Sequence, residues 1–382
     1  MAVSVDNRPS RLRTALAAVL TVLVLVPVGV LFLWVWTDTA DERDSTQLEQ
    51  QGVQYLTALN PLISGLAEAE SSALSGVSAP PAALSDAVGR VNEIDQQLGD
   101  ALRTHERWTG LRDKISRLAG VSGDPVTVFT AHVEVTDLAL ALYNTVRNNS
   151  ALVRDPYNDI SHLQQAMAVD LPGAVVHVSR MGDLSMLVAG ASAKQKAVLA
   201  PQFGAEVQQV NTSVDSLTDN LQAAVDDTDS TTLSGNLVST LDSFRRGVES
   251  LTRGANPGGT PDASTMATAQ TQLQTSLTGL AGVTLREMGS LLEDRMDALN
   301  LRRVEIMVAG SVAVLLVLVA VAVWMTTAMR RRPAPPDRVP GETTRDMRDM
   351  TPSADRGYGG SSLDTVPSFG DPTRRERSGA LR

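Results

Sequence analysis

The chain contains no cysteine. Disulfide bonds, thiol chemistry and cysteine metal sites are therefore excluded. Any folded domain in this chain must be stable through its hydrophobic core alone, and a stretch of about 270 residues is long enough to bury one.

Aromatic residues make up only 3% of the chain. No run of alternating β-branched residues reaches the length of a β-strand. Ala, Leu, Gln, Ser and Thr dominate between residues 37 and 305. The sequence therefore predicts an all-α fold.

Motifs of catalysis are also lacking. The chain has neither a Gly-x-Ser-x-Gly nucleophile elbow nor a Gly-x-x-x-x-Gly-Lys phosphate loop. None of the four histidines is paired with another histidine or a carboxylate at the spacing of metal ligands on one helix; they are His105, His132, His162 and His177. We therefore expect no enzymatic activity, no cofactor and no metal.

Two uncharged apolar segments, 15–36 and 306–328, have the length of about 20 residues that a membrane-spanning helix needs. Arginines precede the first segment and follow the second, which predicts that both termini are cytoplasmic; these are Arg8, Arg11, Arg13, Arg330, Arg331 and Arg332. Arg302 and Arg303 argue weakly for the opposite orientation of the second segment. A cleaved signal peptide is the alternative for the first segment, although its apolar core is longer than usual.

The expected organisation is a cytoplasmic N-terminus, two spans that flank an extracytoplasmic region, and a cytoplasmic tail; the ranges are 1–14, 15–36, 37–305, 306–328 and 329–382. The extracytoplasmic region holds 34 acidic and 19 basic residues, a net charge of −15. This charge argues against binding of nucleic acid or of an anionic lipid surface. The tail is rich in Pro, Gly, Ser and Arg and lacks apolar periodicity, so we expect it to be disordered.

Helical periodicity fills the extracytoplasmic region. We expect the first span to continue as a helix to Ala79-Pro80-Pro81 and the last helix to begin near Asp262 and enter the second span. Five helices are expected between them: 84–118, 125–146, 158–178 with a kink at Pro172, 192–226 interrupted at Pro201 and Gly204, and 231–253. The predicted architecture is an elongated antiparallel helical bundle between two transmembrane helices, with two stacked bundles as an alternative.

Three groups of residues resemble a known family. They are Gly52-Val53-Gln54-Tyr55-Leu56 with Leu59 and Leu62, Trp108 with Leu111, and Asp155-Pro156 with Asp159, Leu163 and Leu171-Pro172. In these residues the chain resembles the helical-bundle sensor ectodomain of bacterial methyl-accepting chemotaxis proteins and transmembrane histidine kinases. Ser161 and His162 stand where the family often carries a tyrosine pair. The cytoplasmic signalling domains of the family are not recognisable after the second span.

Two stretches are candidates for binding a small anion, because each places an arginine beside an aromatic residue. The candidate residues are Arg107 with Trp108, and Arg154 with Tyr157. The alternative is structural: a surface arginine beside a core tryptophan in the first stretch, and turn-forming residues in the second.

The sequence thus predicts a plasma-membrane protein that acts as a sensor-like receptor or accessory subunit and passes an extracytoplasmic event to a cytoplasmic protein through its tail. The resemblance also implies a homodimer. The alternative function is a non-enzymatic envelope scaffold or spacer tethered to the membrane.

Overall fold

The computed structural model describes residues 9–77, 79–153, 155–228, 231–256 and 261–330. Every regular element in these residues is helical and none is a β-strand, which confirms the all-α prediction. The chain divides after Ala320 into two compact units, and the packing described below lies within the first. The predicted disordered tail lies outside the described residues from residue 331 onward.

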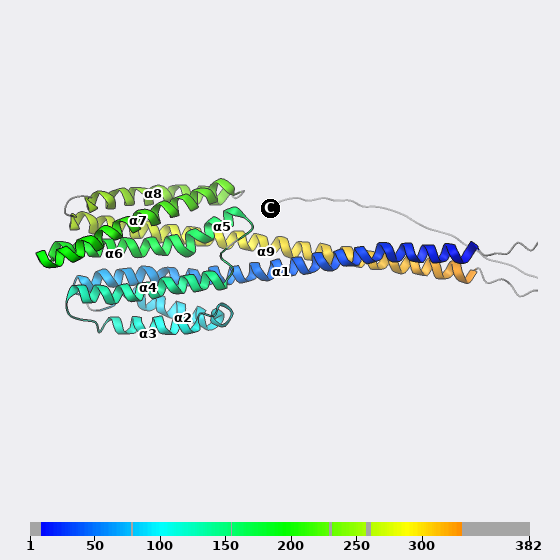
Figure 1. Ribbon diagram of the computed structural model, residues 1–382, viewed down its shortest axis with the longest axis horizontal. Coiled ribbons are helices and arrows are strands. Elements are labelled where there is room, and N and C mark those ends of the chain that lie inside the picture. Colours follow the sequence, from blue (N-terminus) through cyan, green and yellow to red (C-terminus); the bar gives the residue numbers. More distant parts are fainter. Residues whose placement is uncertain (1–8, 78, 154, 229–230, 257–260, 331–382) are drawn as a thin grey trace, which may run out of the picture. The chain divides into compact units, whose positions relative to one another are not determined.

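Nine α-helices and one π-helical segment follow one another in the described part of the chain (Figure 1). They are α1 (Pro9–Leu74), α2 (Ala82–Leu102), α3 (His105–Leu118), α4 (Pro125–Asn149), α5 (Asn158–Gln165), the π-helix η1 (Ala166–Asp170), α6 (Leu171–Gly190), α7 (Ala193–Asp227), α8 (Thr231–Ala255) and α9 (Ala263–Arg330). The long first and last helices agree with the prediction that each apolar segment is continuous with a helix of the bundle.

The helices form two groups that lie side by side within the first unit (Figure 1). The C-terminal half of α1 packs with α2 and α4, and α3 packs on α2 and α4. In the second group α7 packs on α6 and α8, and α9 joins it where Gln274 Nε2 donates a hydrogen bond to the carbonyl of Val175 on α6. Contacts of α6 with α1 and α4 connect the two groups.

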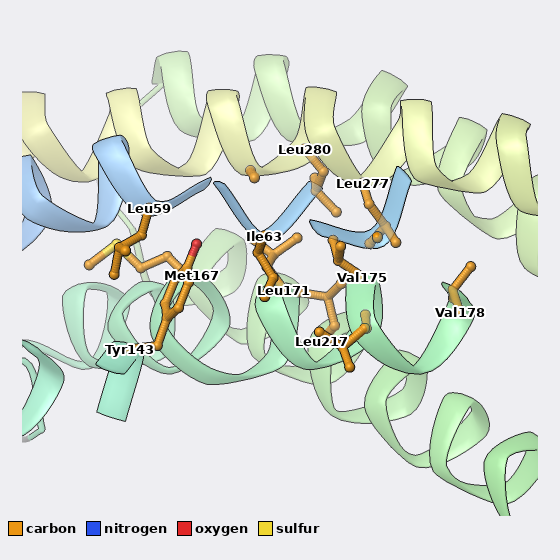
Figure 2. Close-up of a cluster of buried hydrophobic side chains, with 14 of the residues drawn as sticks. Leu59, Ile63, Tyr143, Met167, Leu171, Val175, Val178, Leu217, Leu277 and Leu280 are labelled. Atoms are coloured by element: carbon orange, nitrogen blue, oxygen red, sulfur yellow. The ribbon is translucent and has the colours of Figure 1, made fainter. Parts of the chain in front are cut away.

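One continuous hydrophobic core runs through both groups. Figure 2 shows its centre, where side chains from α1, α4, η1, α6, α7 and α9 meet. Leu59 and Ile63 of α1 are almost fully buried there, as are Leu277 and Leu280 of α9. Burial of each such side chain contributes about 1.5–3 kcal/mol, so the core that the sequence must supply without disulfides is present.

The segment 84–118, predicted as one helix, is two helices. Arg103 adopts a left-handed conformation with φ 52°, which ends α2. Asp95 holds the break in place, because its carboxylate accepts hydrogen bonds from Tyr55 Oη at 2.8 Å and from Thr104 Oγ1 at 2.6 Å, and also contacts His105 Nδ1 at 2.6 Å. The prediction was wrong because hydrophobic periodicity does not register a turn that is fixed by side-chain hydrogen bonds.

The expected interruption at Pro201 and Gly204 is also wrong, since α7 continues through both residues. Leu199 and Phe203 are buried on either side of the proline. Burial of this apolar face outweighs the backbone hydrogen bond that Pro201 cannot make. Near Pro172, where a kink was expected, the five-residue π-helix η1 widens the backbone directly before Leu171.

Three described helices are long and apolar enough to cross a membrane, judged by length and composition. In α1 and α9 the apolar windows are not buried against other parts of the protein; Leu23 and Leu316, for example, are 65% and 61% exposed. The third helix, α4, is 44% buried in its window and places Leu142 and Val146 in the core. An exposed apolar surface of this size on α1 and α9 must be shielded from water by other molecules.

The helices α1 and α9 run antiparallel and side by side. Gln270 on α9 donates a hydrogen bond to Ser71, and Gln50 on α1 donates one to the carbonyl of Leu292. At the other end, the guanidinium of Arg303 lies 5.1 Å from the ring centroid of Trp36, and a Cβ on Gly310 would stand 2.5 Å from the ring of Phe32. From the Phe32–Gly310 contact to the Ser71–Gln270 hydrogen bond there are 39 residues along α1 and 40 residues along α9. The two helices therefore keep one antiparallel register over about 60 Å.

Candidate functional site: a buried charge cluster around Arg295

Arg295 lies on the buried face of α9, in a series otherwise made of apolar residues. Met288, Leu292 and Leu299 precede and follow it at helical spacing and are buried. The arginine side chain itself is only 10% exposed. A buried guanidinium is costly without charged partners, so the groups that surround Arg295 form a candidate site.

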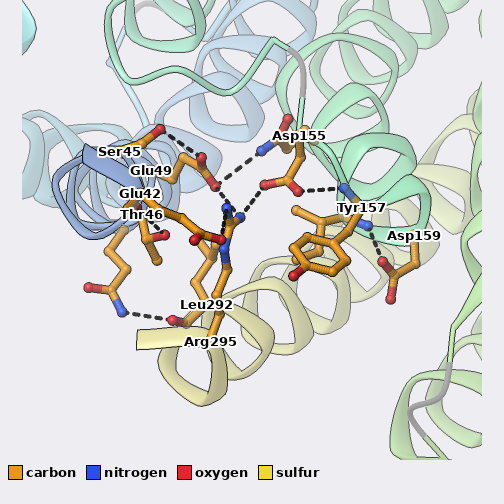
Figure 3. Close-up of polar contacts among 12 residues, drawn as sticks. Glu42, Ser45, Thr46, Glu49, Asp155, Tyr157, Asp159, Leu292 and Arg295 are labelled. Atoms are coloured by element: carbon orange, nitrogen blue, oxygen red, sulfur yellow. Dashed lines mark hydrogen bonds and ion pairs between the residues drawn. The ribbon is translucent and has the colours of Figure 1, made fainter. Parts of the chain in front are cut away.

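Three carboxylates surround this guanidinium (Figure 3). Nη1 of Arg295 lies 2.6 Å from Oδ2 of Asp155 and 3.7 Å from Oε2 of Glu49. Nη2 lies 3.6 Å from Oε1 of Glu42. The fourth partner is Tyr157, whose ring centroid is 5.2 Å from the guanidinium carbon. This distance fits a cation–π contact.

Asp155 is held from two sides. Its Oδ1 accepts a hydrogen bond of 2.8 Å from the backbone N–H of Tyr157, and its Oδ2 accepts the bond from Arg295. The side chain is fully buried. The Asp-Pro dipeptide, interpreted from the sequence as a turn, therefore also anchors the connection between α4 and α5 to α9.

Glu49 differs from the other carboxylates. Its side chain is 3% exposed, and Gln164 Nε2 lies 3.5 Å from its Oε2. Burial, and after it the neighbouring charge of Asp155, raise the pKa of Glu49 to about 8, against the opposing effect of Arg295. Glu49 therefore keeps its proton at neutral pH, which leaves two carboxylates to balance one guanidinium.

The cluster joins three parts of the fold at one point. Glu42 and Glu49 belong to α1, Asp155 and Tyr157 to the α4–α5 connection, and Arg295 to α9. It lies on the bundle side of the contact between Trp36 and Arg303. A change in the charge of this cluster would act directly on the contact between α1 and α9.

The residues predicted to bind an anion do not form the arginine–aromatic pairs that were expected from the sequence. Tyr157, 52% exposed, belongs to the cluster, but its cationic partner is Arg295. Arg154 lies outside the described residues. On α3, Arg107 is exposed while Trp108 is 1% exposed in the core. The structure thus does not bring Arg107 and Trp108 together, and anion binding by these residues stays a prediction.

Sequence reasoning missed Arg295 and Glu49. The signal that could have found them is a charge on an apolar helical face. Glu49 lies on the face of α1 that continues in the buried apolar residues Val53 and Leu56, at steps of four and seven residues. Arg295 lies between the buried apolar residues Leu292 and Leu299, at steps of three and four residues. A charged residue at such a position is either paired in the core or functional.

A second pair of buried acids lies further along the bundle. Glu70 on α1 and Asp183 on α6 are 1% and 0% exposed. Ser71 Oγ donates a hydrogen bond of 2.9 Å to Asp183. Burial raises the pKa of Asp183 to about 7, and burial together with the charge of Asp183 raises the pKa of Glu70 well above its usual range. Burial therefore disfavours the charged form of both acids.

No protein-family model, curated protein or solved structure matches this chain. Among the described residues, no group of three or more His, Asp and Glu side chains is arranged to hold a metal ion. The argument for function therefore depends on the arrangement of the helices and on the charge cluster around Arg295.

Proposed function

We propose that the chain is a plasma-membrane protein that crosses the bilayer twice, through residues 15–36 of α1 and 306–328 of α9. Residues 37–305 then lie outside the cytoplasm and both termini lie inside. The proposal is supported by the exposed apolar surface of both segments and by the arginines that flank them on the cytoplasmic side. The hydrocarbon tails of the lipids then shield this apolar surface from water.

Within this arrangement, the function that we propose is a sensor-like receptor or accessory subunit. The observation that carries it is the Arg295 cluster, which connects the α4–α5 turn to both α1 and α9. An event in the bundle that moves this turn shifts α9 against α1. Because α9 is one helix from Ala263 to Arg330, the shift reaches the second span without an intervening hinge.

The resemblance to helical-bundle sensor ectodomains of chemotaxis proteins and histidine kinases supports this function, and it remains part of the proposal. In such a receptor the output comes from a cytoplasmic protein that binds the tail, 329–382. A homodimer is the association that the resemblance implies. An envelope scaffold, the alternative function, needs the same topology but no shift of α9.

The topology can be tested with single cysteines, since the chain has none of its own. We expect Ala83→Cys, at an exposed position of α2, to react with a membrane-impermeant maleimide in intact cells. Ser353→Cys should react only after the membrane is permeabilised. Labelling of Ser353→Cys in intact cells would contradict the proposed topology and with it the function.

The shift of α9 can be tested by crosslinking. Cysteines in place of Phe32 and Gly310 should be joined in membranes by a short bifunctional maleimide, because the ring of Phe32 lies against Gly310. Adding Asp155→Asn removes the charge that binds Arg295, and we expect a severalfold change in the crosslinking rate. The isosteric control Asp124→Asn alters an exposed carboxylate that makes no helix-capping bond and should leave the rate unchanged. Equal rates for both variants would favour the scaffold.

A further inference from the structure

A cavity of about 170 Å³ lies between α1 and α9, at the point where both helices leave the proposed spans. Its wall includes Trp36, Ala40, Arg43 and Asp44 on α1 with Arg303 and Ile306 on α9. Trp36 is the last residue of the first proposed span, and Ile306 is the first residue of the second. The cavity therefore lies between the apolar surface of the spans and the polar surface of the bundle.

The two arginines of this wall lie at the depth of the lipid headgroups. Arg43 follows Trp36 by seven residues, about 10 Å along α1, and Arg303 precedes Ile306 by three residues, about 4.5 Å along α9. Helical side chains lean toward the N-terminus of their helix, so Arg43 leans toward the membrane and Arg303 leans away from it. Both guanidinium groups thus approach the headgroup layer, which extends roughly 5–8 Å beyond the hydrocarbon on each side.

Neither arginine has a carboxylate partner among the described residues. The side chain of Arg43 forms no ion pair or hydrogen bond there, and its Nε is buried without a partner. Arg303 places its guanidinium 5.1 Å from the ring centroid of Trp36, a contact that leaves most of its N–H donors available. The nearby Glu42 contacts Arg295 and Arg302 instead. Two unpaired guanidinium groups on one cavity indicate an anion from outside the chain.

The charge around the cavity restricts which anion can bind. Asp44 also lines the wall, is exposed, and forms no ion pair among the described residues. A ligand that matches all three charged side chains carries a phosphate and a cation. The acidic surface of residues 37–305 likewise favours a ligand without net negative charge. Trp36, the aromatic ring that could recognise a quaternary ammonium, already bears the guanidinium of Arg303, so a primary ammonium fits better.

We propose that this cavity binds the headgroup of a phospholipid with a primary amine, with the phosphodiester on Arg43 and Arg303 and the ammonium on Asp44. A guanidinium donates paired hydrogen bonds to a phosphate, and an ammonium donates to a carboxylate. The acyl chains then lie on the exposed apolar surface of the spans, which begins at Trp36 and Ile306. The inference rests on the two spans of the proposed function, but not on their orientation or on a sensor output.

The proposal can be tested by lipid titration of the full chain in a nonionic detergent. The probe is dioleoyl phosphatidylethanolamine, and native mass spectrometry counts the bound lipids. We expect one saturable site that prefers this lipid about 3- to 10-fold, the value of one hydrogen bond, over the dioleoyl forms of phosphatidylcholine, phosphatidylglycerol and diacylglycerol. Free glycerophosphoethanolamine, the same headgroup without acyl chains, should displace the lipid only at a far higher concentration, because it buries no apolar surface.

Four variants locate the site. Arg43→Gln and Arg303→Gln should each weaken binding about 3- to 10-fold, whereas Arg302→Gln, at the neighbouring arginine outside the wall, should not. Asp44→Asn should remove the preference over phosphatidylglycerol. The matched control Asp41→Asn alters a carboxylate that is also exposed but does not line the cavity, and it should keep the preference. An unchanged circular dichroism spectrum shows that a variant is folded.

Several results would overturn the inference. Absence of a saturable site, or equal binding of phosphatidylethanolamine and diacylglycerol, would mean that the headgroup is not recognised. Displacement by glycerophosphoethanolamine at the concentration of the lipid would make the cavity a site for a soluble phosphate. Tighter binding of phosphatidylglycerol would exclude the contact with Asp44, and unchanged binding in both arginine variants would exclude the phosphate contact. Orientation in the cell plays no part in detergent, so a failure here leaves the cysteine-labelling test of the topology unaffected.

Discussion

Replacing Arg295 with methionine is expected to lower the free energy of unfolding of the helical bundle by about 3–5 kcal/mol. Methionine keeps most of the length and the apolar stem but removes the cation. Asp155 would then be a fully buried carboxylate without its charged partner, 2.6 Å away in the native protein. The loss can be measured by urea unfolding of the full chain in nanodiscs, followed by circular dichroism.

Arg302 provides the matched control for this substitution. It lies on the same helix and contacts Glu42 at 4.0 Å, but its side chain is 52% exposed. Arg302→Met should cost less than about 1 kcal/mol, as is usual for exposed ion pairs. Asp155→Asn in the Arg295→Met background should restore part of the stability, since it removes the unpaired charge. Equal losses for Arg295→Met and Arg302→Met would show that the cluster does not stabilise the fold.

Raising the pH from 6.5 to 8 is expected to destabilise the bundle. Glu49 has a pKa of about 8 in the folded protein against an ordinary value of 4.5. Between these values the folded protein holds a proton that the unfolded chain has released, so stability falls as pH rises and the loss is complete above about pH 8. Each such proton gives a slope of up to about 1.4 kcal/mol per pH unit.

Glu70 and Asp183 act in the same direction, because their pKa values are also raised in the folded state. The lowered pKa of His132 reduces the stability of the folded protein only as pH falls below the ordinary histidine value of 6.5. His132 therefore does not contribute to the change between pH 6.5 and 8. Glu49→Gln should flatten the slope, because a glutamine cannot lose a proton. Glu134→Gln, at an exposed side chain paired with Lys114, should keep it. Stability that rises with pH in the unmodified chain would contradict the burial of these acids.

Most of the helices could be predicted from the sequence. Helices α1, α4, α8 and α9 begin or end within a few residues of the predicted positions. Apolar periodicity and the residues that start or stop a helix, such as Pro80, Pro125 and Asp262, act locally. Asp262 shows this directly, since its carboxylate accepts hydrogen bonds from the backbone of Ser264 and Thr265 at the start of α9. Tyr157 was also identified as a candidate, from its place in the Asp-Pro turn.

The tertiary structure decided what depends on residues far apart in the chain. The left-handed turn at Arg103 needs Asp95 and Tyr55, and the continuity of α7 at Pro201 needs a buried face on which to pack. The side-by-side placement of the two helix groups follows from which faces of α1 and α6 bury each other.

The sequence by itself determined the all-α class, the two apolar segments and the acidic charge between them, because composition and periodicity are properties of neighbouring residues. It could not determine that Arg295 pairs with Asp155, 140 positions away, or that Glu49 is protonated beside them. Both follow from burial, which removes water from charges and makes their pairing and protonation depend on the few groups within contact distance. The candidate site therefore exists only in the folded protein.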